Sequence, residues 1–122
     1  GKEMIVKLKY PIKVDGKEVK ELPFDTSTFG LAELTRANNM AAKQSAGIMT
    51  AQETDFNYHF AVACIVVEKS SENKISVEDL RRLKGSDLFN LQSKGRDFLL
   101  ESAILEQETL EGVSEAMEES SE

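Results

Sequence analysis

A strict alternation of apolar and polar residues near the N-terminus is the feature that most limits what this chain can fold into. The apolar residues of one parity are Val6, Leu8, Tyr10, Ile12 and Val14. A period of two is typical of a strand buried on one face. Asp15-Gly16 follows directly, and this pair suits a two-residue turn, because both central residues of such a turn need positive φ. The sequence therefore predicts an N-terminal β-hairpin over residues 4–24.

The length of the turn sets the register of this hairpin. The expected pairs are Val14 with Lys17, Ile12 with Val19, and Lys13 with Glu18. Leu22 and Phe24 have the wrong parity to continue from Val19. We therefore expect either a β-bulge near Lys20 and Glu21 or an end of pairing there, and Pro23 favours the end.

Helical spacing follows the hairpin and predicts helices over about 28–46, 51–68, 76–84 and 86–105. Thr28 is the expected cap of the first helix, whose inward stripe is Phe29, Leu31, Leu34, Ala37 and Ala41. Thr50 to Glu53 and Ser76 to Asp79 have the pattern of capping boxes, and Leu80 and Leu83 form the inward pair of the third helix. The last helix has a narrow seam of Leu88, Leu91, Gly95, Phe98, Ser102 and Leu105, in which Gly95 permits a close crossing.

The helix expected at 51–68 is apolar over most of its circumference, which is typical of the most buried element of a fold. Ile65-Val66-Val67 leaves a strand open as an alternative for this run. The fold class expected from these patterns is α+β: an N-terminal β-hairpin followed by a small bundle of about four helices. A single domain would span residues 1–105.

Charge is distributed unevenly along the 122 residues, whose formal net charge is -7. Residues 106–122 contain seven Glu and no Lys or Arg, so residues 1–105 are balanced with 15 acidic and 15 basic side chains. This C-terminal segment also carries Leu110, Val113 and Met117 at near-helical spacing. It is typical either of an acidic amphipathic helix or of a disordered solubilising tail. A balanced domain with an acidic tail disfavours phosphate-dominated binding of nucleic acid.

Catalytic and metal-binding patterns are scarce. His59 is the only histidine and Cys64 the only cysteine, and on a helix they point about 140° apart, so they cannot form a nucleophile–base couple. No catalytic, cofactor-binding or metal-binding residue is therefore expected, and no cofactor. The longest run without charge, 56–67, is shorter than the roughly 20 residues of a membrane span. The N-terminus has no pattern of a secretion signal, so a reducing cytoplasm is expected.

The chain resembles the small tail assembly chaperones of long-tailed phages, of the Mu-like E or 41 type. The resemblance covers roughly residues 4–100. It is carried by Ile5 to Leu22, by Thr28-Phe29-Gly30-Leu31, and by the short helix Val77 to Leu83 with Gly85-Ser86-Asp87-Leu88 after it. Where members of the family often have a basic Leu-Arg-Arg-Pro stretch, this chain has Leu22-Pro23-Phe24-Asp25, so a role of those arginines does not carry over.

The resemblance implies a non-enzymatic protein of the bacterial host cytoplasm that binds the tape measure protein during tail assembly and is absent from the finished tail. The tail tube protein and a second copy of the chain are further candidate partners; nucleic acid and membrane are not. The expected partner-binding residues are Phe98, Leu105, Leu110, Val113 and Met117. Two alternatives stay open: a structural tail or adaptor protein retained in the virion, and a regulatory DNA-binding module using the helices of 76–98.

Overall fold

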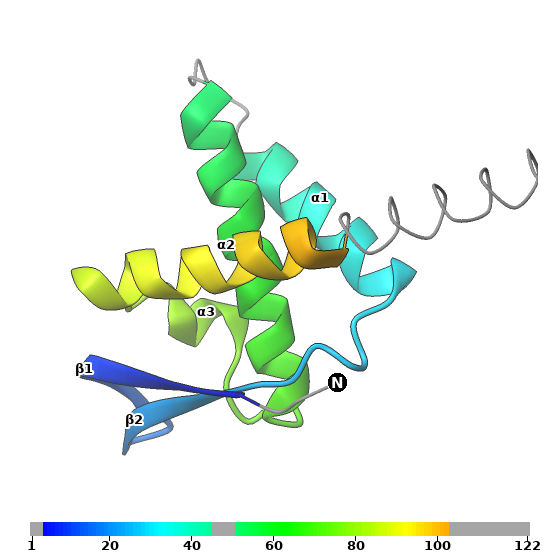
Figure 1. Ribbon diagram of the computed structural model, residues 1–122. Helices are drawn as coiled ribbons and strands as arrows, with labels where there is room; N and C mark the ends of the chain where they lie inside the picture. Colours follow the sequence, from blue (N-terminus) through cyan, green and yellow to red (C-terminus); the bar gives the residue numbers. More distant parts are fainter. Residues whose placement is uncertain (1–3, 45–50, 103–122) are drawn as a thin grey trace, which may run out of the picture.

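The computed structural model describes residues 4–44 and 51–102. It is an α+β fold with an antiparallel hairpin of β1 (Met4–Val14) and β2 (Lys17–Phe24), followed by α1 (Leu31–Gln44), α2 (Ala51–Ser70) and α3 (Val77–Leu80). A fourth helix begins at residue 86 and is described to residue 102. Figure 1 shows α1 beside α2, the 86–102 helix crossing α2, and the hairpin near the end of α2. The predicted fold class is confirmed.

The hairpin turns at Asp15 and Gly16, whose φ angles are 52° and 79°. The pairs expected next to the turn are all present: Val14 with Lys17, Lys13 with Glu18, and Ile12 with Val19. Positive φ at both central residues is the condition of a type I′ turn. The structural role predicted for Asp15 and Gly16 is therefore confirmed.

The irregularity of the hairpin lies where the sequence placed it, at Lys20 of β2, and the extra residues are those of β1. The register shifts between Lys7 and Ile12, so residues 8–11 of β1 lie opposite Lys20 alone. Pairing does not end there, because Val6 with Leu22 and Met4 with Phe24 continue it. The extra residues of β1 change which residues of β2 lie opposite its core-facing side chains. As a result, Leu22 and Phe24 face the core with Val6 and Ile12. Tyr10 falls within the bulge and is 41% exposed, so its predicted burial was wrong.

The middle of α2 is the centre of the core. Every residue from Ala61 to Val67 is buried, which confirms the central helix and excludes the strand alternative for Ile65-Val66-Val67. The hairpin, α1, α3 and the 86–102 helix cover different sides of this run. Their buried side chains include Leu22, Phe24, Ala37, Leu80, Leu83 and Leu91.

Helix α1 begins three residues after the predicted cap. The carbonyl of Gly30 accepts the first helical bond, from the amide of Leu34, and the amide of Gly30 donates to the Glu33 carboxylate, so Gly30 rather than Thr28 is the cap. Leu31 lies in the first turn and is 80% exposed, which corrects its place in the inward stripe. Ala37 and Ala41 are buried as expected.

Helix α3 is shorter than predicted, because the chain leaves the helix after Leu80. The predicted capping box is present: the Ser76 hydroxyl accepts from the amide of Asp79, and the Asp79 carboxylate accepts from the amide of Ser76. Leu80 and Leu83 are both buried, so the predicted inward pair is confirmed although Leu83 lies beyond the helix. The other predicted capping box includes Thr50, which lies outside the described residues.

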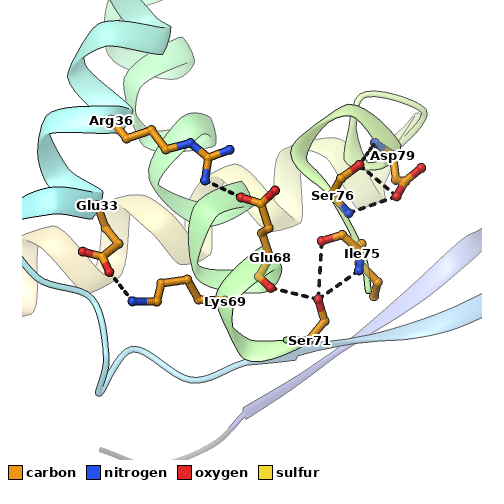
Figure 2. A network of polar contacts seen from close by, with 8 residues as sticks. All are labelled: Glu33, Arg36, Glu68, Lys69, Ser71, Ile75, Ser76 and Asp79. Atoms are coloured by element: carbon orange, nitrogen blue, oxygen red, sulfur yellow. Dashed lines mark hydrogen bonds and ion pairs between the residues drawn. The ribbon is translucent and has the colours of Figure 1, made fainter. Parts of the chain in front are cut away.

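Polar contacts join α1 to α2 and shape the loop that follows α2. Figure 2 shows Arg36 paired with Glu68 and Lys69 paired with Glu33 across the two helices. In the loop, the Ser71 hydroxyl donates to the carbonyl of Glu68 and accepts from the amide of Ile75. The hydrogen bond from Lys69 also lowers the pKa of the Glu33 carboxyl. These contacts fix the end of α2, against which the hairpin lies.

Candidate partner-binding groove

A small groove lies between the open end of the hairpin and the 86–102 helix. Its volume is about 390 Å³, and its lining residues are Met4, Phe24, Thr26, Lys94, Asp97, Phe98 and Glu101. Met4 is 46% exposed, whereas Phe24 is buried and Phe98 half-buried. We call this the Met4–Phe98 groove. Met4, Phe24 and Phe98 supply its apolar surface, and the charged side chains come from the 86–102 helix. Such a groove suits an apolar side chain that projects from a polar partner surface.

Phe98 is held in position by an aromatic neighbour. The ring of Phe98 packs edge-on against Phe29, with 5.3 Å between ring centroids and 81° between ring planes. Phe29 lies in the turn between β2 and α1, so three separate parts of the chain shape the groove. The predicted partner-binding residue Phe98 therefore lies in a cleft. The other four predicted partner-binding residues, Leu105, Leu110, Val113 and Met117, lie outside the described residues.

The helical wall of the groove is placed by a close contact at Gly95. An ideal Cβ on Gly95 would lie 2.2 Å from the carbonyl oxygen of His59 and 3.1 Å from the Cβ of Ala63. Only glycine lets the 86–102 helix approach the α2 backbone this closely. The close crossing predicted at Gly95 is confirmed. Within the predicted seam, Leu91 is also buried, but Ser102 is exposed, so the seam ends earlier than expected.

The hairpin wall is tied to the same helix by Asp87. Its carboxylate, 3% exposed, accepts hydrogen bonds from the backbone amides of Lys9 at 2.9 Å and Tyr10 at 2.7 Å. The bulge of β1 frees these amides from β2. Tyr10 also lies against Gly85, since an ideal Cβ there would be 3.1 Å from the Tyr10 ring. The 86–102 helix therefore forms one wall of the groove and, through Asp87, holds the hairpin that forms the other.

Neither His59 nor Cys64 has the surroundings of a catalytic group. Cys64 is fully buried, and burial raises the pKa of its thiol far above the ordinary range. Burial disfavours the charged form of His59 too, which for an imidazole lowers the pKa. The charge of Asp55 opposes this shift and that of Arg96 adds to it. The Nδ1 atom of His59 lies 3.4 Å from the side-chain nitrogen of Gln92. His59 is therefore a half-buried residue at the crossing of two helices.

Metal-binding clusters and membrane spans are not found in the described part of the chain. In residues 4–44 and 51–102, no three His, Cys, Asp or Glu side chains come together as metal ligands would. No helix in these same ranges has the length and apolar content needed to cross a bilayer.

The groove could not be found from local sequence patterns. Met4 and Phe24 come together because of the bulge, and Phe98 approaches them only through the crossing at Gly95. Parity in the hairpin could have indicated Met4, since it shares the parity of Val6, but Phe98 lies near the opposite end of the described chain.

The described part of the chain is a hairpin docked on a small helical bundle, with the Met4–Phe98 groove between them. Residues 5–100 match the family of phage tail assembly chaperone proteins, E, or 41 or 14. The chain belongs to this family, as the resemblance in its sequence indicated. No curated protein and no solved structure matches it.

Proposed function

We propose that this protein binds the tape measure protein of its phage during tail assembly and keeps it soluble, acting in the cytoplasm of the bacterial host without catalysis. The family match over residues 5–100 carries the proposal. A tape measure protein has long helical segments with apolar stripes, and such a helix needs a partner surface that takes apolar side chains. The Met4–Phe98 groove has this chemistry.

The groove can be tested with two neighbouring residues of β1. Met4 lines the groove, whereas Ile5 is 53% exposed and does not line it. Met4→Asp places a charge where an apolar side chain would dock, and an unpaired charge is costly to bury. We expect the tape measure protein recovered with the co-expressed chaperone to fall about tenfold.

Ile5→Asp is the matched control, and it should retain binding close to that of the original protein. Equal binding by both variants and the original would contradict the groove. The proposal also predicts that purified virions lack the protein. Its presence there in fixed proportion to the tail tube would favour the structural alternative.

Residues 106–122 form the second part of the proposed binding surface. The proposal assigns this segment to partner binding rather than to the core, so deleting residues 107–122 should leave the unfolding midpoint nearly unchanged. The same deletion should weaken co-purification with the tape measure protein. A variant with Leu110, Val113 and Met117 changed to Ser keeps all seven Glu and separates the apolar stripe from the charge. Full binding by this variant would limit the segment to a solubilising role.

A further inference from the structure

The two outer edges of the hairpin differ. At the outer edge of β1, the bulge and Asp87 hinder the pairing of a further strand, because the amides of Lys9 and Tyr10 donate to the Asp87 carboxylate. A bulge and a covering element are both ways in which proteins protect an edge strand. Along β2, within the part of the chain that the structure describes, backbone pairing joins the strand to β1 alone. The edge of β2 is therefore the one left open.

A cleft runs along this open edge. Its volume is about 730 Å³, and it is lined by residues 17–21 and 23 of β2, by residues 14 and 15 at the turn, and by residues 70–72, 74 and 75 at the end of α2 and in the connection to α3. Successive residues of β2 line it, which is expected for a cleft beside a strand, since successive side chains of a strand point to opposite faces. Such a cleft has the shape to take another extended strand.

The turn determines which backbone groups face this cleft. In a hairpin with a two-residue turn, the residues that flank the turn bond to each other, and the bonding direction alternates along the strand. Lys17 and Val19 therefore direct their amides and carbonyls to β1. Glu18 and Lys20 direct theirs outwards, where an added strand could bond to them.

The sequence of the edge is complementary to itself. Residues 17–21 are Lys-Glu-Val-Lys-Glu. If a second copy of this strand lies antiparallel, centred on Val19, Glu18 faces Lys20, Val19 faces Val19, and Lys20 faces Glu18. Lys17 and Glu21 lie outside these pairs, since Lys17 pairs with the buried Val14 and Glu21 with the exposed Lys7, on opposite faces of the hairpin. Facing pairs of opposite charge stabilise a sheet and facing like charges destabilise it.

Other registers lack this match. A shift by one residue places Lys17 opposite Lys20 in one direction and Glu18 opposite Glu21 in the other. A shift by two places Glu18 or Lys20 opposite itself, and a parallel strand in register pairs every charge with its like. The pair of Lys13 with Glu18 already present across the hairpin continues into Lys20 of the added strand as a row of alternating charge.

We propose that two copies of this protein associate through antiparallel pairing of their β2 strands about Val19, forming a four-stranded sheet across a two-fold axis. This inference does not rest on the proposed binding of a tape measure protein. It uses the edge strand and the cleft beside it, and leaves the Met4–Phe98 groove of each copy unoccupied.

Charge exchange between the two copies tests the pairing. Lys20→Glu places a second carboxylate opposite Glu18 of the other copy, and Glu18→Lys places a second ammonium group opposite Lys20. We expect the full-length protein to form dimers in sedimentation velocity. Each variant alone should have a dimer dissociation constant raised about tenfold or more. An equimolar mixture of the two should form dimers again, because both facing pairs then have opposite charges.

Lys43→Glu is the matched control, since it makes the same charge change at an exposed position of α1 far from the hairpin in the chain. It should dimerise like the original protein. Hydrogen exchange provides a second measurement: the amides of Glu18 and Lys20 should become protected as concentration rises, in the original protein but not in either variant alone. A monomer at all concentrations, or variants that dimerise alone as well as the mixture does, would overturn the proposal.

Discussion

Replacing Gly95 by Ala is expected to lower the free energy of unfolding by about 2 kcal/mol, although the change favours helix formation. Alanine in place of glycine inside a helix contributes roughly 0.5–1 kcal/mol of stability. Against this, the new Cβ would lie 2.2 Å from the carbonyl oxygen of His59, which belongs to the α2 backbone and cannot rotate away. Overpacking of this kind costs roughly 1–3 kcal/mol or more. The 86–102 helix must therefore move off α2, and chemical denaturation measures the cost.

Gly30→Ala provides the control for this change. An ideal Cβ on Gly30 has its nearest neighbour, a carboxylate oxygen of Glu33, at 3.7 Å, which is ordinary contact. We expect a loss within about 1 kcal/mol there, since the position is a helix cap. Gly95→Val should be more harmful than Gly95→Ala. A Gly95→Ala protein with an unchanged or higher midpoint would show that the helices do not cross as closely as described.

Replacing Asp87 by Ala is expected to cost about 3 kcal/mol, because it removes two hydrogen bonds to a charged acceptor at once. The amides of Lys9 and Tyr10 would lose their partner, and the bulge of β1 gives them no alternative in β2. Hydrogen exchange should become faster at these two amides in particular. Asp87→Asn keeps one acceptor oxygen and should lose less stability than Asp87→Ala.

Asp97→Ala is the comparison on the same helix, because the Asp97 side chain is 56% exposed and its ion pair is with its neighbour Arg96. Loss of such a surface pair changes stability by at most about 1 kcal/mol. If Asp87→Ala and Asp97→Ala had equal effects, the Asp87 carboxylate would not hold the hairpin as the structure describes.

Local patterns were sufficient to predict the elements of this fold and insufficient to predict how they meet. The turn at Asp15-Gly16, the capping box at Ser76 and the buried run of α2 each depend on residues close in sequence, and each was predicted. The irregularity at Lys20 was predicted as well, from the parity of Leu22 and Phe24, but the extra residues of β1 and their hydrogen bonds to Asp87 were not, because Asp87 meets β1 only once the 86–102 helix is in place. Asp87 belongs to a segment that carries the family resemblance, but nothing near it in the sequence indicated its partners.

The same reasoning applies to the groove. Phe98 was predicted as a contact residue from its place in a helical seam, and the structure puts it in a cleft. Met4 and Phe24 were missed because their alignment with Phe98 is a product of tertiary packing. Leu31 was assigned to the inward stripe by spacing alone, and it is exposed in the structure.

The bond between Asp87 and the β1 bulge also bears on the order of events during synthesis. The hairpin leaves the ribosome before the helices and can form its turn locally, since two-residue turns close quickly. Its acceptor at Asp87 is 77 and 78 residues further along the chain. Until that residue has been made, the hairpin has an unfinished edge at Lys9 and Tyr10. Completion of the N-terminal element therefore waits for the last helix of the described chain, so a nascent protein stopped before Asp87 should carry a hairpin that has formed but cannot dock.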